Sequence, residues 1–298
     1  MRISLLLACA WLLASRSSAQ VTVEIATDQD QFLPGESMVV GVRITNFSGQ
    51  TLHFGKTTNW VSFVVKGEDG YDVNRRGEVP ISGEFDVESS SRGTRRVDLA
   101  PYFNLTQLGR YRISAVVRVE AWDKAIVSSP KTIDIIRATK IWDQVFGVPS
   151  SAGPGEPPEA RRFTLQQAVT VKHARLYVRL TDASEAQIYQ TFALGPLVSF
   201  GSPQAMLDAL NNLHVLWQTD ARKFGYAVVD AGGHLVLRQT HMYSNTRPDL
   251  RGNKDGKVDV VGGLRVVTAL DLPPQDPPET PSETPSSPPP ADGKSPKS

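Results

Sequence analysis

The sequence predicts an all-β protein with two domains and an extended tail. Short apolar runs that alternate with polar residues, separated by turn residues, fill most of the chain from residue 20 to residue 272, which is the pattern of antiparallel strands. A second observation is a gapless internal match at an offset of 37 residues. It aligns Leu176 with Leu213, Val178 with Val215, Tyr189 with Tyr226, Gly195 with Gly232 and Val198 with Leu235.

Residues 1–19 have the composition of a cleaved export signal. Arg2 precedes an apolar run over residues 3–13, and small residues precede the expected cleavage point after Ala19. A competing interpretation makes Cys9 a lipid-attachment site, but the apolar run continues beyond it. Cleavage would remove the only cysteine, so the mature chain would form no disulfide. Export without disulfides favours a bacterial protein of the periplasm or the cell surface.

The charge of the chain excludes two classes of partner. The formal net charge is +1, and it stays the same when the two arginines of the signal and the net negative charge of the tail are both removed. A chain with so little net charge has no strong positive potential that would attract nucleic acid or an anionic membrane. No apolar run after residue 19 approaches the roughly 20 residues of a membrane-spanning helix. We therefore expect no nucleic-acid partner and no membrane span.

Residues 20–137 are predicted to form an antiparallel β-sandwich. A Pro-Gly turn at residues 34–35 leads into a strand in which Val40, Val42 and Ile44 occupy alternate positions and should face the core. Strands are expected at residues 21–26, 37–46, 61–65, 94–99, 110–119 and 131–136. No helical periodicity interrupts them.

A tyrosine near the end of this domain gives a more particular signal. The spacing of Gly109 and Tyr111 resembles the tyrosine corner of immunoglobulin-like and fibronectin-like sandwiches. The resemblance implies that the Tyr111 hydroxyl bonds back to the main chain. It also implies that Val42 and Ile113 stand where other members of this fold have a core disulfide.

The same domain is similar to the bacterial proteinase-inhibitor domain of the BsuPI type. The similarity rests on four features in the same order along the chain. They are an apolar strand ending at Asn46, the segment Ser-Gly-Gln-Thr-Leu at residues 48–52, a hairpin at residues 67–70 and the segment Gly-Arg-Tyr-Arg at residues 109–112. It implies that residues 20–137 inhibit a protease.

The second domain is placed at residues 138–272. A strand at residues 141–147 precedes a loop rich in Pro, Gly and Ser over residues 149–158. The two repeats that follow resemble blades of a sialidase-type propeller. A propeller needs at least about four blades, whereas the chain offers two and a fragment at residues 256–263. We therefore predict a duplicated meander that forms a sandwich or a small barrel.

One short helix is predicted between the repeats. Ser202 and Pro203 suit a cap and a first-turn proline, and the apolar residues Ala205, Met206 and Leu207 follow them.

Residues 273–298 are predicted to be a disordered tail. Ten of these 26 residues are proline and none is aromatic, so the segment cannot bury enough surface to fold. Two PxxP motifs start at Pro274 and Pro278, but an extended spacer or envelope tether is the preferred interpretation.

Local catalytic motifs are missing from the sequence. It has no nucleophile elbow, no zinc-protease motif and no phosphate-binding glycine loop. The polar stretch at residues 249–259 resembles a calcium loop, but its residues do not fit the ligand positions of an EF-hand, so a hairpin turn is expected. We predict no catalytic residue, no cofactor and no metal.

The histidines are the candidate metal ligands of the chain. His214 alternates with Leu213 and Val215, so it should point away from their core face, into an outer or half-buried position. A metal site made by His214, His234 and His241 would need all three on one face. Surface or hydrogen-bonded histidines are the preferred interpretation.

Four side chains are the candidates for a recognition surface: Trp142, His214, His241 and Tyr243. Tyr243 lies in a polar loop and is expected to be exposed. Trp217 and Tyr226 are expected in the core instead, because they are in register with apolar positions of the repeat.

Three functions follow from these patterns. The preferred one is a non-catalytic exported protein that binds or organises an envelope polymer or another protein at the cell surface. The first alternative is protease inhibition by the first domain. The second is glycan hydrolysis by carboxylates such as Asp220 or Asp230 of the second domain.

Overall fold

The computed structural model describes residues 21–149, 158–170, 173–198 and 201–273. The predicted signal, the tail beyond Pro273 and most of the loop after residue 149 lie outside these residues. Within the described residues the regular elements are strands, apart from one 3-10 turn at Glu120–Trp122. The predicted all-β fold class is confirmed.

The first β region is a sandwich of two sheets. One sheet has the order β1-β3-β7, and the other has the order β2-β10-β8-β5 with β9 attached to β8; β4 and β6 form a separate pair. The strands are β1 (Val21–Thr27), β2 (Gln31–Phe32), β3 (Val39–Asn46), β4 (Leu52–Phe54), β5 (Val61–Lys66), β6 (Phe85–Val87), β7 (Ser91–Asp98), β8 (Gly109–Val119), β9 (Lys124–Val127) and β10 (Lys131–Ile135). All six predicted strands are present, and four short ones were missed.

The core of this sandwich follows the alternation of the sequence. Val40, Val42 and Ile44 are each 0% exposed on β3, and Ile113 of β8 is 0% exposed in the same cluster. An apolar core therefore includes both positions that the immunoglobulin resemblance had assigned to a replaced disulfide. Because apolar burial contributes roughly 25 cal/mol per Å², the sheets need no covalent link.

The predicted tyrosine corner is present. Tyr111 donates a hydrogen bond from its hydroxyl to the main-chain oxygen of Gln107, at 2.9 Å. This bond joins the start of β8 to the preceding loop, so it fixes the path on which the chain enters the sheet.

Replacing Tyr111 by phenylalanine should destabilise the first region by about 1 kcal/mol, because the ring packing is kept while one partly buried hydrogen bond is lost. Chemical denaturation measures the difference. Tyr71→Phe is the control, since Tyr71 is 77% exposed. Equal stability of the two variants would contradict a stabilising role for the corner.

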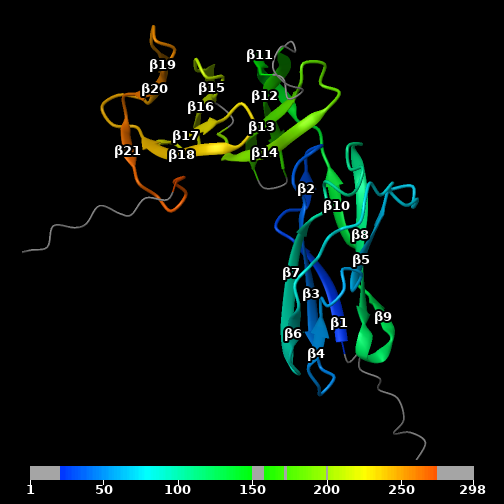
Figure 1. The fold of residues 1–298 in the computed structure, drawn as a ribbon. Coiled ribbons are helices and arrows are strands. Elements are labelled where there is room, and N and C mark those ends of the chain that lie inside the picture. Colours follow the sequence, from blue (N-terminus) through cyan, green and yellow to red (C-terminus); the bar gives the residue numbers. More distant parts are fainter. Residues whose placement is uncertain (1–20, 150–157, 171–172, 199–200, 274–298) are drawn as a thin grey trace, which may run out of the picture.

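The second β region is also a sandwich. Its sheets have the orders β11-β12-β13-β14 and β15-β16-β17-β18-β21, and β19 and β20 form a separate hairpin. The strands are β11 (Thr139–Val148), β12 (Glu159–Val169), β13 (Ala174–Asp182), β14 (Ile188–Pro196), β15 (Gln204–Leu207), β16 (Leu213–Gln218), β17 (Lys223–Val229), β18 (Leu235–Met242), β19 (Asp249–Gly252), β20 (Val258–Val261) and β21 (Leu264–Val266). In Figure 1 this region lies across the end of the first region where β2 and β10 are found.

The internal repeat corresponds to two hairpins that face each other. Leu176 and Val178 of β13 and their matches Leu213 and Val215 of β16 are all 0% exposed in one shared core. The second region is therefore a packed sandwich, and the two repeats contribute to the same core. The third strand of the first repeat is not formed at Val198, and residues 199–200 lie outside the described part.

The predicted helix is wrong. Residues Gln204–Leu207 form β15, which pairs antiparallel with β16. Alanine, methionine and leucine are good helix formers, but tertiary context overrides helix propensity, and pairing with β16 decides the conformation here. The Gln204 side chain holds the strand from its other side, donating to Asp249 at 2.9 Å and accepting from the N–H of Leu250 at 2.7 Å.

The polar stretch predicted to be a hairpin turn forms the hairpin β19–β20. Leu250 and Val258 of this hairpin cover the outer face of the second sheet, against Leu216, Phe224 and Tyr226. Strands β16 and β17 are therefore buried on both faces.

Candidate binding site between the two β regions

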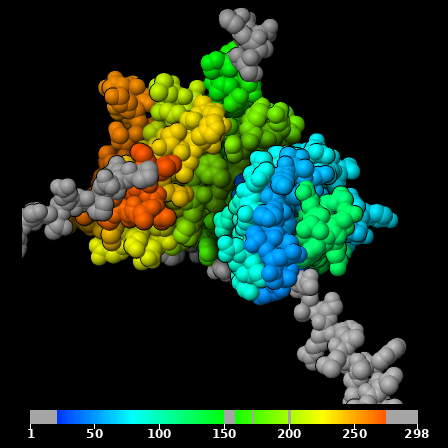
Figure 2. All heavy atoms as spheres, turned by 60° about the horizontal axis from the view of Figure 1, so that its bottom comes forward, coloured from blue at the N-terminus to red at the C-terminus, as the bar shows by residue number. Residues whose placement is uncertain are grey.

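The two regions are joined by a packed contact. Leu33 of the first region lies in one buried cluster with Tyr177 and Ala168 of the second. The Thr191 hydroxyl donates to the main-chain oxygen of Pro34 at 3.2 Å, and Arg175 donates to Gln29 at 2.6 Å. The predicted boundary at residue 137 lies between β10 and β11. Figure 2 shows the two β regions in contact.

Glu36 is the buried acid of this contact. Its carboxylate accepts hydrogen bonds from the Gln29 amide at 2.7 Å and from the N–H of Leu33 at 2.8 Å. Burial raises the pKa of Glu36 above its ordinary value, although both hydrogen bonds and Arg175 oppose that change. Burial, together with the nearby Glu36 charge, also raises the pKa of Tyr177 to about 12.

A cleft of about 600 Å³ opens beside this contact, and both regions line it. The first region contributes the loop before β3, the segment around Arg76 and the end of β7, and the second contributes the turn between β13 and β14. The lining mixes apolar residues such as Met38 and Ile188 with polar ones such as Asp98 and Gln190. Such clefts between domains are common places for ligands.

Hydrogen bonds hold the walls of the cleft in place. Asp98 accepts from the N–H groups of Met38 and Ala100, at 2.7 and 3.0 Å. Tyr189 donates to Glu159 at 2.6 Å, and the Arg161 guanidinium lies 4.9 Å from the centre of its ring. These contacts fix the positions of the wall residues Asp98 and Tyr189.

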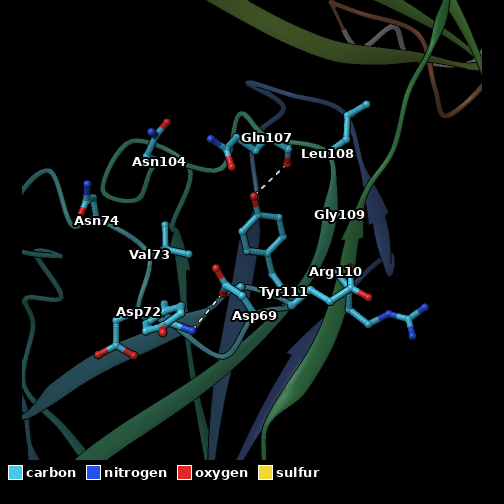
Figure 3. A pocket seen from close by; sticks show the side chains of 13 residues that line it. Asp69, Asp72, Val73, Asn74, Asn104, Gln107, Leu108, Gly109, Arg110 and Tyr111 are labelled. Atoms are coloured by element: carbon cyan, nitrogen blue, oxygen red, sulfur yellow. Dashed lines mark hydrogen bonds between the residues drawn. The ribbon is translucent and has the colours of Figure 1, made fainter.

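A second hollow lies in the first region, beside the tyrosine corner. It has a volume of about 390 Å³ and is lined by residues 67–69, 71–74, 104 and 107–111. Figure 3 shows that the hairpin segment and the segment entering β8 come together around Tyr111. These are two of the four segments behind the proteinase-inhibitor resemblance, and the sequence did not predict that they share a pocket.

Comparisons with known proteins add little to this geometry. No protein-family model matches the chain, and no curated protein matches it in sequence. Among solved structures, the chain is similar to Spo0M, the sporulation control protein of Bacillus subtilis, with a TM-score of 0.29 and 6% identity over 59% of this chain and 91% of that chain.

Two of the four candidate recognition residues are buried. His214 and His241 are each 7% exposed, whereas Tyr243 is 43% exposed as expected and Trp142 packs partly against the core of the second region. The outer or half-buried position expected for His214 is a wrong prediction. The alternation did turn it away from Leu213, but the hairpin β19–β20 covers the face on which it lies.

His214 belongs to a buried hydrogen-bonded chain. Its Nδ1 lies 2.7 Å from the Tyr226 hydroxyl and its Nε2 lies 3.2 Å from Asp208. Burial alone would raise the pKa of Asp208, but hydrogen bonds from Asn212 and His214 outweigh it and lower that pKa. Burial, with Asp259 and Asp208, raises the pKa of Tyr226 to about 12. These three side chains, Asp208, His214 and Tyr226, could in principle relay a proton. Tyr226 is only 6% exposed, however, so the buried hydrogen bonds favour a structural role.

His241 packs edge-on against Tyr226, with ring centres 6.0 Å apart. Its Nε2 has no hydrogen-bond partner in the part of the chain that the structure describes. Burial lowers the pKa of His241, and Arg265 lowers it further, while Asp271 acts in the opposite direction. The folded protein therefore favours the neutral imidazole.

Acid should consequently destabilise the second region. The stability that comes from neutral His241 is present above its ordinary pKa of 6.5 and is lost as the pH falls through the lower folded-state pKa. His241→Leu should make the loss between about pH 7 and pH 5 shallower, by up to about 1.4 kcal/mol per pH unit. Denaturation at several pH values measures this slope. His234→Leu serves as the control, because that side chain is 70% exposed, and an unchanged slope in His241→Leu would refute the assignment.

The two carboxylates considered for glycan hydrolysis do not form a pair. Asp220 and Asp230 lie in the turns at opposite ends of β17. A strand of seven residues spans about 23 Å at about 3.3 Å per residue, whereas the carboxyl groups of glycosidases lie about 5–10 Å apart. Asp230 is also engaged by the N–H groups of Gly232 and His234, at 2.9 and 2.8 Å.

Among the described residues, no three His, Cys, Asp or Glu side chains lie close enough together to hold a metal ion. None of the helices among these residues is long and apolar enough to cross a membrane.

Proposed function

We propose that the chain is a non-catalytic exported protein that binds an envelope polymer or protein through the cleft between its two β regions. The observation that carries the proposal is the cleft of about 600 Å³, lined from both regions. Wall residues that are already hydrogen-bonded suit recognition, since they lower the ordering cost of binding. The export signal predicted at residues 1–19 and the Pro-rich tail support a location in the envelope.

Blocking the cleft tests the proposal. Ala186 is exposed and lines the cleft, so Ala186→Trp should fill part of it without disturbing a core. Ala125→Trp is the matched control, because Ala125 is exposed on β9 at the other end of the first region (Figure 1). The chain from Gln20 to Ser298 is incubated with cell-wall polysaccharides and envelope fractions, and retention is measured.

We expect retention of the unmodified chain and of Ala125→Trp, and a loss of about tenfold or more in Ala186→Trp, corresponding to about 1.4 kcal/mol. No retention of the unmodified chain on any fraction would refute the proposal. Equal retention of both variants would place binding elsewhere. Fractionation of cells that produce the full-length chain tests its export separately.

Protease inhibition by the first region is the second candidate. It is supported by the resemblance to immunoglobulin-like inhibitor domains of the BsuPI type and by the way residues 67–69 and 109–111 meet around one pocket. Titration of the chain against serine, cysteine, metallo- and aspartic proteases tests it. Full activity of every enzyme at micromolar concentrations of the chain would exclude this function.

A further inference from the structure

The pocket beside the tyrosine corner carries a more specific inference than the cleft. It holds about 390 Å³ between residues 67–74 and residues 104–111. The Tyr111 ring stands in the middle of the labelled side chains, with Asp69 and Asn74 on one side and Gln107 above (Figure 3). Its volume is at the lower end of the range for ligand sites, about 300–1,000 Å³.

We propose that this pocket binds one or two units of a neutral saccharide. It is a different site from the cleft, with which it shares no lining residue.

Unused hydrogen-bonding groups are the first reason. The side-chain amides of Asn74 and Gln107 line the pocket, and neither takes part in a hydrogen bond within the described residues. Each amide can donate and accept at the same time. Sugar hydroxyl groups also do both, so they can satisfy the amide N–H groups and the amide oxygens together.

An exposed aromatic ring is the second reason. Tyr71 lines the pocket and is 77% exposed. Its main-chain N–H donates a hydrogen bond to Asp69 at 3.0 Å, which holds the backbone at this position. A tyrosine ring presents an apolar face at small entropic cost. The C–H face of a sugar ring can pack on it while the hydroxyl groups reach the polar rim.

The charge of the lining selects against acidic ligands. Glu68, Asp69 and Asp72 line the pocket, and among the described residues only Asp72 forms an ion pair, with Lys66 at 3.8 Å. Arg110 compensates them only in part, because its side chain turns away in Figure 3 and pairs with Asp134 at 2.9 Å, and Glu68 is its weaker electrostatic partner. A uronic acid or a sulfated sugar would meet like charge.

The same carboxylates would attract a basic peptide, which is the competing ligand. An ammonium or guanidinium group donates but cannot accept. Such a group could stack on the exposed face of Tyr71, but it offers no acceptor to the N–H groups of Asn74 and Gln107. The lining as a whole therefore fits a neutral polyol better than a cation.

Two pocket variants test the site without threatening the fold, since Tyr71, Asn74 and Gln107 are all exposed. Binding of the unmodified chain, Tyr71→Ala and the double variant Asn74→Ala/Gln107→Ala is measured by calorimetry against neutral gluco-, manno- and galacto-oligosaccharides, an oligogalacturonate and an oligolysine. Phe47→Ala is the matched control, because Phe47 is an exposed aromatic residue outside the pocket, at 61%.

At least one neutral oligosaccharide should bind, with affinity reduced about tenfold in Tyr71→Ala and in the double variant and unchanged in Phe47→Ala. Oligogalacturonate should not bind. Binding of oligolysine alone, binding that survives in both pocket variants, or the absence of any saccharide binding would overturn the proposal. Ala186→Trp should leave saccharide binding intact, so failure of the cleft and failure of this pocket give different results.

Discussion

Replacing Gly225 by alanine should destabilise the second β region by about 3 kcal/mol, the upper end of the usual cost of overpacking a core. Gly225 of β17 is the direct cross-strand partner of Trp217. A methyl group added at Gly225 would lie 2.4 Å from Cζ2 and 2.7 Å from Cε2 of the indole ring. The ring cannot move aside easily, because it is 3% exposed and its N–H donates to the main-chain oxygen of Pro196 at 3.1 Å.

Chemical denaturation, monitored by far-ultraviolet circular dichroism, measures the loss in the free energy of unfolding. Gly147→Ala is the control, because Gly147 also lies in a strand of the second region and an added methyl group there would only touch Pro158, at 3.6 Å. Trp217→Phe in the Gly225→Ala background should recover part of the stability, since a smaller ring frees the space. If Gly225→Ala is as stable as Gly147→Ala, the close packing of the indole is refuted.

The core of each sandwich could be predicted because strand alternation is a local property. Val40, Val42 and Ile44 could be placed inside from their spacing alone, and so could Leu176 and Leu213. The tyrosine corner could also be predicted, since one hydrogen bond over four residues, Tyr111 to Gln107, creates it.

Features that depend on distant segments could not be predicted. The face that holds His214 looked solvent-exposed, because nothing near it in sequence shows that Leu250 and Val258 cover it. Residues Gln204–Leu207 looked helical for the same reason, since their conformation comes from pairing with β16. Both candidate sites are likewise long-range features. The pocket joins residues about 40 apart, and the cleft joins the loop before β3 to the turn after β13.

The matched tyrosines of the repeat show how a duplicated scaffold can diverge. Tyr189 packs against the core between the two sheets, and its hydroxyl is bound by Glu159. Tyr226 lies on the opposite face of its sheet, with Leu250 and Val258 of the added hairpin. The same repeat position therefore supports a wall of the cleft in one copy and a covered outer face in the other.

Replacing Gly35 by alanine should loosen the contact between the two regions and cost about 2 kcal/mol. The sequence predicts only a turn at residues 34–35, but Gly35 has a φ of +77° and an added methyl group would lie 2.7 Å from Cγ2 of Ile188 in the second region. A side chain at positive φ costs about 1–2 kcal/mol by itself. The two regions would have to move apart to avoid the clash. This movement would break the hydrogen bond from the Thr191 hydroxyl to the main-chain oxygen of Pro34.

Small-angle scattering measures the expected increase in the radius of gyration, and denaturation measures the stability. Gly49→Ala is the matched control, since Gly49 has a φ of +84° and open space around it, so it incurs only the backbone cost. Ile188→Ala in the Gly35→Ala background should restore the compact form, because the clashing methyl group is then absent. An unchanged radius in Gly35→Ala would mean that Gly35 does not determine how closely the regions meet, and the cleft would then depend on Arg175 and Gln29 instead.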